Sequence, residues 1–258
     1  MRRAHQLRTA ELYRWDAHRI MGRRFMLSEN DIVTIAAYCK DKLDLANATL
    51  NDEYYYQSLP LCVIDAVFSM GARYSSTENT VRRVCEYFGL KLYSRERLPI
   101  SEQLSVSEFI SLYDRFSIEE MADRIYQNRQ RTSTRNGILK AEAVLLFVKA
   151  LRQFEVDYYQ DMSKVEGKVE FETKVAEIPG QRSGISTRYF YMLAGSDDYI
   201  KPDRMITNFI GSVIQRKLSL VEIHEAIIRT HRILAKEFPQ LTPRVLDHQI
   251  WLYQREKN

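Results

Sequence analysis

Apolar residues along this chain recur mainly every three or four positions, the spacing that places them on one face of a helix. Leu61, Ile64 and Val67 follow this spacing, and almost all of their neighbours are apolar as well. A helix buried on most of its sides is therefore expected there. The same spacing predicts amphipathic helices over about 141–151 and 206–213.

Capping signals indicate where other helices begin. In the pattern Ser-x-x-Glu, the serine and glutamate side chains accept hydrogen bonds from each other's backbone N–H groups. This pattern begins at Ser75, Ser105, Ser117 and Ser219. Ser28 predicts a helix to about Leu50, and Thr242 predicts the start of the last helix. A short extended piece is expected at Val169–Phe171.

The composition favours an all-α fold. Hydrophobic residues make up 45% and charged residues 28% of the 258 residues, a balance typical of globular proteins in water. Nine glycines and six prolines are few for this length, which favours helices over a sandwich of short strands. The sequence has no apolar run as long as the ~18 residues of a membrane span and no secretory signal. A cytoplasmic protein, associated with the nucleoid if it binds DNA, is expected.

The cysteines and histidines do not indicate a metal site. Cys39, Cys62 and Cys85 are far apart in apolar surroundings, which matches neither a zinc-ligand spacing nor a disulfide framework. The five histidines also lack ligand spacing. We therefore expect no bound metal and no cofactor.

Positive charge is concentrated at the start of the chain. Residues 1–24 contain seven arginines against Glu11 and Asp16, a balance of +5 that exceeds the net charge of +4 of the whole sequence. A basic segment of this kind suits contact with a phosphate backbone, although a solvated amphipathic helix has the same pattern. We divide the chain into a basic helical arm over 1–27 and one domain over 28–258.

The segment from Val175 to Phe209 has the order helix, glycine-bearing turn, helix, loop, and then a helix that begins at Asp203. A turn of this type presents backbone N–H groups to an anion. Pro202 and Asp203 before an apolar periodic run are also typical of an ordinary helix N-cap. The two roles are compatible, because the partial positive charge at a helix N-terminus keeps a carboxylate ionised.

This segment resembles the helix–hairpin–helix DNA glycosylases, a superfamily that includes endonuclease III and the alkyladenine glycosylases. Residues Glu177–Gly180 match the Leu-Pro-Gly start of the family hairpin. Arg182 stands where the family usually has a glycine, and Gly184 follows two residues later. The resemblance places the hairpin over about 175–190. The DNA-binding residues that it implies there are Gly180, Gln181, Arg182, Ser183 and Gly184.

The resemblance further implies that Asp203 is catalytic, because its carboxylate would stabilise the positive charge that forms on the sugar as the base leaves. Lys201 and Arg204 are expected to hold neighbouring phosphates. Family members that also cut the strand have a lysine just after the hairpin glycines, a position that falls at about Gly184. A monofunctional enzyme is therefore implied. It would lack the family's iron–sulfur cluster, since no cysteine follows Cys85.

An earlier element of the family also has a counterpart. The apolar helix around Val63 leads into a polar turn, and in the family this turn inserts a side chain into the DNA duplex. The inserted residue should be Arg73 or Tyr74, unless the turn simply joins two helices. The residues expected to line a pocket for an extruded base are Tyr54, Tyr55, Tyr126, Gln127 and Tyr189.

Three hypotheses result. The first is a monofunctional DNA N-glycosylase that flips a damaged or modified base out of double-stranded DNA, in repair or in antiviral defence against modified phage DNA. The second is a helix–hairpin–helix DNA-binding protein without catalytic activity, and the third is an unrelated helical interaction protein. For the first, the resemblance implies an all-α, two-lobed monomer with a DNA-binding cleft that Asp203 faces.

Overall fold

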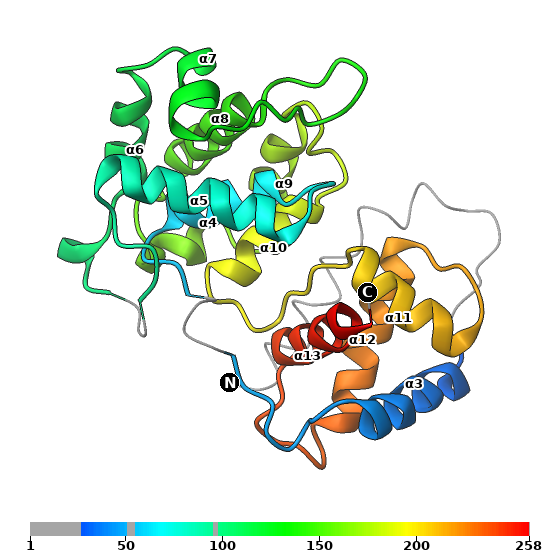
Figure 1. Cartoon of the computed structure of the whole chain (residues 1–258). Helices are drawn as coiled ribbons and strands as arrows, with labels where there is room; N and C mark the ends of the chain where they lie inside the picture. Colours follow the sequence, from blue (N-terminus) through cyan, green and yellow to red (C-terminus); the bar gives the residue numbers. More distant parts are fainter. Residues whose placement is uncertain (1–26, 51–54, 95–97, 258) are drawn as a thin grey trace.

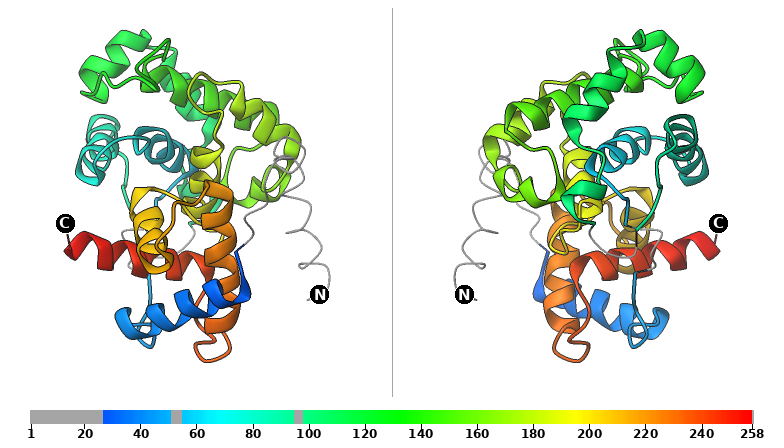
Figure 2. Two further views of the ribbon diagram at one scale, coloured as in Figure 1. Left: turned by 90° about the vertical axis from the view of Figure 1, so that its right-hand side faces the viewer. Right: turned by 90° about the vertical axis from the view of Figure 1, so that its left-hand side faces the viewer.

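The computed structural model describes residues 27–50, 55–94 and 98–257, and these fold entirely into helices and loops without a β-strand (Figure 1). The predicted all-α class is therefore confirmed. The helices form two lobes that lie side by side and are joined by extended segments (Figures 1 and 2). We name them the middle lobe, residues 55–199, and the terminal lobe, residues 27–50 and 200–257.

The middle lobe is built around α4 (Leu59–Phe68), all of whose residues are buried. This burial follows from its apolar sequence, in which Asp65 is the one charged residue. Its other helices are α5 (Tyr74–Phe88), α6 (Val106–Tyr113), α7 (Ile118–Glu120), α8 (Lys140–Gln153), α9 (Val169–Ala176) and α10 (Ile185–Leu193), with short 3-10 or π turns at Ile100–Glu102, Met121–Ile125 and Tyr159–Lys164. Helices α8 and α10 both pack against α4.

The terminal lobe combines the two ends of the described chain. Its helices are α3 (Glu29–Lys42), α11 (Arg204–Ile214), α12 (Leu220–Leu234) and α13 (Pro243–Glu256). Helix α3 packs against α11 and α12, so that Ile35 shares a hydrophobic core with Ile223. A separate core fills the middle lobe, from Tyr56 to Tyr199. Each lobe thus has its own core, and polar side chains from both lobes meet at the junction.

Local capping signals correctly locate most of the predicted helix starts. Ser105, Ser117 and Ser219 each accept a hydrogen bond from the N–H of the glutamate three residues later, and that carboxylate accepts one from the serine N–H. Thr242 caps α13 through the N–H of Val245. These starts are confirmed, because both partners of each bond lie within one short segment of sequence.

Three local predictions are wrong. The Ser75 box does not form: the N-cap of α5 is Arg73, two residues before Ser75, and its side chain makes no capping bond within the described chain. Helix α3 ends well before Leu50, because Leu43 adopts an extended backbone (φ −113°, ψ 144°). Val169–Phe171 is not extended but begins α9, and acidic residues in that first turn favour the helix.

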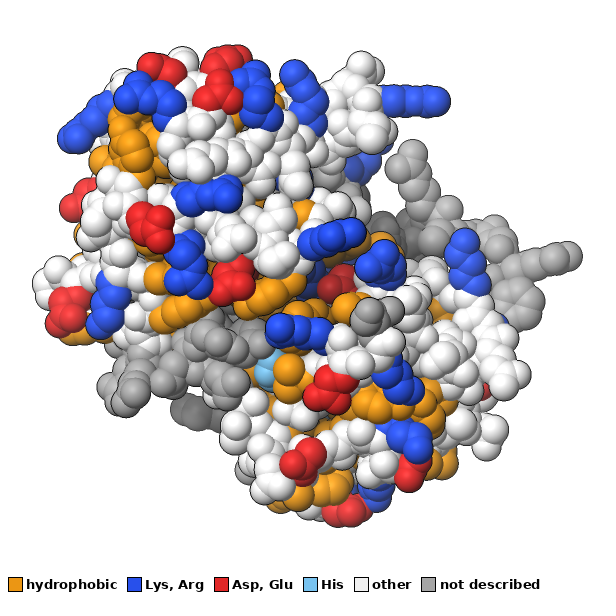
Figure 3. Space-filling model, viewed as in Figure 1, with side chains coloured by type: hydrophobic (Ala, Val, Ile, Leu, Met, Phe, Trp, Pro, Cys, Tyr) orange, Lys and Arg blue, Asp and Glu red, His pale blue; other side chains and the backbone are white. Residues whose placement is uncertain are grey.

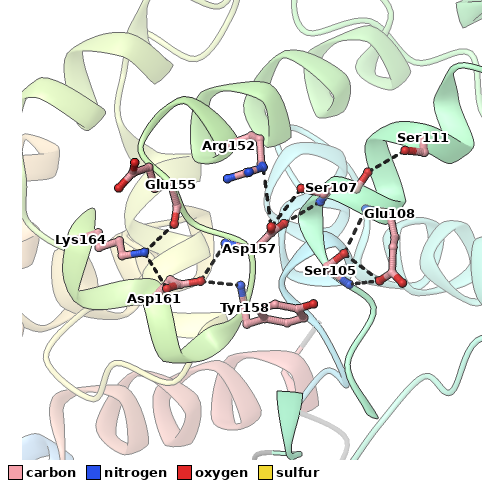
Figure 4. Close-up of polar contacts among 10 residues, drawn as sticks. All are labelled: Ser105, Ser107, Glu108, Ser111, Arg152, Glu155, Asp157, Tyr158, Asp161 and Lys164. Atoms are coloured by element: carbon pink, nitrogen blue, oxygen red, sulfur yellow. Dashed lines mark hydrogen bonds and ion pairs between the residues drawn. The ribbon is translucent and has the colours of Figure 1, made fainter. Parts of the chain in front are cut away.

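A polar network from the segment after α8 holds the start of α6 (Figure 4). The Asp157 carboxylate accepts hydrogen bonds from the backbone N–H of Ser107 at 2.7 Å and from its hydroxyl at 3.0 Å. The backbone N–H of Asp157 donates in turn to Asp161, whose other oxygen is paired with Lys164 at 2.8 Å. The network ties elements of the middle lobe to each other, and we assign it a structural role.

Candidate functional site

The predicted hairpin is a tight turn between α9 and α10. It runs from Ile178 to Gly184, with hydrogen bonds from Gln181 N to the Ile178 carbonyl at 2.9 Å and from Gly184 N to the Gln181 carbonyl at 3.1 Å. Gly180 and Gly184 have φ values of +87° and +70°, a region that glycine adopts without steric strain. The two glycines therefore stand where the backbone of the turn needs them.

The tip of this turn leaves backbone N–H groups unpaired. Those of Arg182 and Ser183 have no acceptor among the described residues. The described chain also offers α10 no side-chain cap, and Ile185 N lies 3.5 Å from Ser183 Oγ. The Arg182 side chain is exposed. Unpaired N–H groups at a helix start, next to a guanidinium, are suited to a phosphate.

One hairpin residue differs from its neighbours. Gln181 is 2% exposed, so its side chain is not placed to reach DNA, contrary to the prediction.

Gly180 packs against the loop before α8, where an added Cβ atom would lie 2.5 Å from Thr132 Cβ. Arg131 and Arg135 in this loop are exposed, so the hairpin has basic side chains beside it.

Gly180→Ala should destabilise the protein more than Gly184→Ala. Positive φ costs an alanine roughly 1–2 kcal/mol at either position. At Gly180 the added methyl group would also lie 2.9 Å from the Thr132 carbonyl oxygen, whereas nothing lies within 4 Å at Gly184. We expect the first variant to lose about 1–3 kcal/mol more unfolding free energy in urea titrations. Equal losses would contradict the packing of the hairpin on this loop.

Asp203 begins α11 and is its N-cap. One carboxylate oxygen, Oδ1, accepts hydrogen bonds from Met205 N at 2.8 Å and Ile206 N at 3.2 Å. The other oxygen, Oδ2, receives no hydrogen bond from a described residue, and the side chain is half-buried. The capping role therefore leaves one oxygen available for chemistry.

Polar side chains from both lobes meet near Asp203. We name as the interlobe cluster the residues Tyr56, Asp65, Tyr189, Lys201, Asp203 and Asp247. The Lys201 ammonium lies 3.8 Å from the centre of the Tyr189 ring. The Tyr189 hydroxyl donates to Asp65 Oδ2 at 3.3 Å, and the Tyr56 hydroxyl donates to the same oxygen at 2.9 Å. The segment that leads into α11 is thus connected to the middle of α4.

Burial sets the electrostatics of two carboxyl groups in this cluster. It raises the pKa of Asp65, while Lys201 and the two phenol groups counteract that shift. It raises the pKa of Asp247 well above its usual range, and the nearby Asp203 carboxylate adds to the rise. Asp247 Oδ1 accepts a hydrogen bond from the backbone N–H of Lys201 at 3.3 Å. Asp247 therefore holds the segment that precedes Asp203.

A buried lysine orders the end of α4. Lys140 is 2% exposed, and its amine donates to the Phe68 and Met70 carbonyl oxygens at 2.9 and 2.8 Å. A third bond goes to Gln130 Oε1 at 2.9 Å. Burial lowers the pKa of Lys140 to about 8, and the charge of Lys201 adds to the effect. Lys140 thus satisfies the carbonyl groups that the helix end leaves without partners.

The turn between α4 and α5 lies next to the terminal lobe. Arg73 is exposed, and Tyr74 is 39% exposed with its ring centre 5.3 Å from a ring centre of Trp251 in α13. A polar groove of about 470 Å³ beside the turn is lined in part by Arg73, Asn79 and Arg83. Arg73 and Tyr74, the two residues predicted to insert into the DNA duplex, are therefore accessible at the junction of the lobes.

Tyr126 is a core residue, so its prediction as a base-pocket residue is wrong. It is 0% exposed, its ring centre lies 4.9 Å from that of Phe68, and its hydroxyl is hydrogen-bonded to that of Tyr113. A signal for this was present in the sequence. Tyr126 lies four residues after the apolar Ala122, the spacing of one helix face, and Ala122 is buried.

The other predicted pocket residues are scattered. Gln127 is exposed. The Tyr55 ring is partly covered by Arg244 of α13, whose guanidinium carbon lies 5.0 Å from the ring centre. Tyr54 falls outside the described residues. Tyr189 does belong to the interlobe cluster, but Lys201 covers one face of its ring. It therefore contributes a hydroxyl group rather than a free stacking surface.

Basic side chains gather around the junction. Figure 3 shows Lys and Arg side chains spread between the two lobes, with an acidic side chain recessed among them. Arg204 is exposed at the start of α11. Lys201 is half-buried, and its ammonium faces the Tyr189 ring, which makes it less available to a phosphate than predicted. The basic arm predicted over 1–27 lies outside the described residues except for Leu27.

Three residues of this cluster, Tyr56, Asp65 and Asp247, are not among the predicted site residues, and Asp65 carried the clearest signal. An acidic residue inside an otherwise apolar helix is unusual, since burying a carboxylate without partners is costly. The run Leu-Cys-Val-Ile-Asp-Ala-Val-Phe therefore contained a usable signal. In the part of the chain that is described, no three His, Cys, Asp or Glu side chains are grouped to hold a metal ion. No described helix has the length and apolarity that crossing a membrane requires.

Comparison with known proteins places the chain in a family. The family model described as Domain of unknown function (DUF8548) matches residues 33–255. The chain belongs to this family. No curated protein and no solved structure matches it. The DUF8548 match extends from within α3 to within α13, so it includes both lobes, the hairpin and the whole interlobe cluster.

Proposed function

We propose that this DUF8548 protein is a monofunctional DNA N-glycosylase, which hydrolyses the bond between a damaged or modified base and deoxyribose in double-stranded DNA. The observation that carries the proposal is the position of Asp203. Its carboxylate begins α11 at the junction of the lobes and has an oxygen to which no described residue donates.

The hairpin is suited to hold the DNA backbone beside the extruded nucleotide. The unpaired N–H groups of Arg182 and Ser183, with the Arg182 guanidinium, match the acceptor oxygens of a phosphate. Tyr189 lies roughly 6 Å along α10 from its start, since each helical residue rises ~1.5 Å. A phosphate bound at the hairpin would therefore bring the neighbouring sugar close to the interlobe cluster.

Asp203 would act on the sugar. As the bond between C1′ and the base nitrogen breaks, its electron pair leaves with the base and positive charge develops on the sugar ring. The ionised carboxylate stabilises this charge, and Oδ2 can accept a proton from the water that attacks C1′. The departing base takes up the proton that the water released, so the products are the free base and an abasic site. Oδ1 continues to cap α11, which fixes the position of the carboxylate.

The proposal does not include cleavage of the DNA strand. Gly184 stands where strand-cleaving members of the resembled superfamily have a lysine. The Lys140 amine already donates to three oxygen atoms, and the Lys201 ammonium lies against the Tyr189 ring. The abasic strand should stay intact until alkali or heat is applied, and borohydride should trap no covalent adduct. If an adduct forms, its loss in Lys201→Ala would show that the Lys201 amine is the nucleophile.

The decisive experiment is the release of a base. The purified protein is incubated with genomic DNA of varied modification, including phage DNA, and the released bases are identified by mass spectrometry. Abasic sites are counted in the same samples with an aldehyde-reactive probe. Release of a base with matching abasic sites supports the proposal, whereas DNA that is bound but unchanged contradicts it.

A DNA-binding protein without catalytic activity is the second candidate. One observation favours it: Asp203 already has a complete structural role, with two N–H groups capped by Oδ1. Arg182 in place of a hairpin glycine is compatible with binding alone. The two candidates share the DNA interface and differ only in the chemistry of Asp203.

Arg182→Ala should weaken DNA binding and reduce its dependence on salt. The slope of log K against log salt is negative, and each phosphate contact that is lost makes it less steep by about 0.9. Fluorescence anisotropy with a labelled duplex at several salt concentrations measures this slope. Arg124→Ala is the control, because Arg124 is an exposed arginine of the same lobe that lies 3.6 Å from Glu120. An unchanged slope for Arg182→Ala would remove the hairpin from the interface.

A further inference from the structure

Asp65 is a buried acid that the mechanism above does not use. It lies in the middle of α4, among apolar core residues, and is 5% exposed. Its Oδ2 atom accepts two hydrogen bonds, one from Tyr56 and one from Tyr189. No described residue donates to its Oδ1 atom. The carboxyl group is therefore oriented through one oxygen only.

A carboxyl group in this position lowers stability. Removing an ionised group from water costs on the order of several kcal/mol, and burial raises the pKa of Asp65 accordingly. An apolar side chain of similar volume would avoid this cost. The two phenol donors and the Lys201 ammonium reduce the cost but leave Oδ1 without a bond from the described chain. Such an arrangement is expected where a ligand completes the hydrogen bonds.

Asp65 lies near the place where the two lobes meet. The charges that act on it include that of Lys201, just before α11. Burial and the Asp65 carboxylate raise the pKa of Tyr189, and Tyr74 of the α4–α5 turn and Asp247 of the terminal lobe add to that rise. Asp65 is thus linked through Tyr189 to Lys201 and the segment that leads to Asp203.

We propose that Asp65 determines base specificity, with Oδ1 accepting a hydrogen bond from the amino group of the extruded base. This inference rests on the proposed function. Tyr56 and Tyr189 occupy Oδ2, so Oδ1 is the oxygen left to contact a base. A carboxylate accepts from an N–H group and repels a carbonyl oxygen, so the site selects bases with an exocyclic amino group over those with a carbonyl group at the same position.

Two pairs of bases test this selection directly. Adenine and hypoxanthine differ at two adjacent edge positions: adenine has an amino group beside an unprotonated ring nitrogen, and hypoxanthine has a carbonyl oxygen beside a ring N–H. Cytosine and uracil differ in the same way. A mismatched base is extruded at lower cost than a paired one. The probes are therefore four duplexes that carry one of these bases in a mismatch at the same position.

The experiment compares the wild type with Asp65→Asn. Asparagine has nearly the same size, and its oxygen can accept from both tyrosines while its nitrogen replaces Oδ1 as a donor. The wild type should prefer adenine to hypoxanthine and cytosine to uracil. Asp65→Asn should invert these preferences, with each ratio changing by about 10- to 100-fold. Tyr56→Phe removes one donor to Oδ2 and should reduce the ratios without inverting them.

Two readouts separate this inference from the proposed function. Base release by each protein tests the glycosylase activity, and equilibrium binding in the Asp203→Asn background tests the preference even where no base is released. Glu172→Gln is the control, because it neutralises another carboxyl group of the middle lobe whose pKa burial raises. Its binding ratios should match those of the wild type.

The binding ratios decide the inference. Inversion in Asp65→Asn, with reduction in Tyr56→Phe, supports it. Equal ratios in the wild type and Asp65→Asn, or a wild type that distinguishes neither pair, would overturn it. Thermal unfolding shows whether each variant is folded, and if Asp65→Asn is not, the ratios of Tyr56→Phe decide: unchanged ratios then overturn the inference as well.

Discussion

Asp203→Asn should slow base release by about 10²–10³-fold while DNA affinity changes little. Asparagine has the shape of aspartate, and its side-chain oxygen can still accept from the N–H groups of Met205 and Ile206. Helix α11 therefore keeps its cap. The variant lacks the negative charge that stabilises the sugar cation. Single-turnover release and equilibrium binding, on a DNA from which the wild type releases a base, measure the two effects separately.

The matched control is Asp197→Asn, the same exchange at an exposed acid in the loop before α11. It should release the base at the wild-type rate. If Asp203→Asn keeps full activity, Asp203 has only its structural role as a cap, and the glycosylase mechanism proposed here is wrong. If both variants lose activity to the same extent, the loss reflects the loop rather than the carboxylate at the start of α11.

Lys140→Met should lower the free energy of unfolding by about 2–4 kcal/mol. Methionine fills a similar volume but cannot donate to the carbonyl oxygens of Phe68 and Met70, which accept from the lysine amine at 2.9 and 2.8 Å. Both oxygens lie at the end of the fully buried helix α4. A buried carbonyl group without a donor costs roughly 1–3 kcal/mol. Urea unfolding followed by circular dichroism measures the loss.

Lys149→Met serves as the control for this prediction. Lys149 is exposed on the same helix, α8, so its replacement should change the unfolding free energy by less than about 0.5 kcal/mol. Comparable stability of the two variants would mean that water or a rearranged turn replaces the Lys140 amine. The position of the α4–α5 turn, and with it of Arg73 and Tyr74, would then not depend on this lysine.

Helix starts were predictable because short-range interactions define them. Ser105 and Ser219 each bond to a residue three positions later, and Asp203 bonds to the two residues that follow Arg204. Both partners of such a bond lie within a few residues of each other in the sequence. The same reasoning failed at Ser75, where the turn after α4 is held by Lys140, 70 residues away from Met70 in the chain.

The sequence predicted poorly which side chains of the candidate site are buried. Tyr126 and Gln181 are polar or amphipathic residues that were predicted to face DNA, yet both are buried, and Tyr126 packs against Phe68 of α4. Conversely, Asp65 lies in a run that predicts a core helix, and the tertiary structure brings it to the interlobe cluster. Side-chain burial depends on which helices pack together, and sequence periodicity alone does not contain that information.

The sequence by itself determined the all-α class, most of the helix starts, the glycines between α9 and α10, and Asp203 at the start of α11, since each depends on residues a few positions apart. Only the tertiary structure decided that Asp65 and Tyr189, 124 residues apart, share a hydrogen bond, and that Lys201 lies on the Tyr189 ring. The physical reason is that these contacts exist only after α4 and α10 have packed and the segment before α11 has been placed beside them.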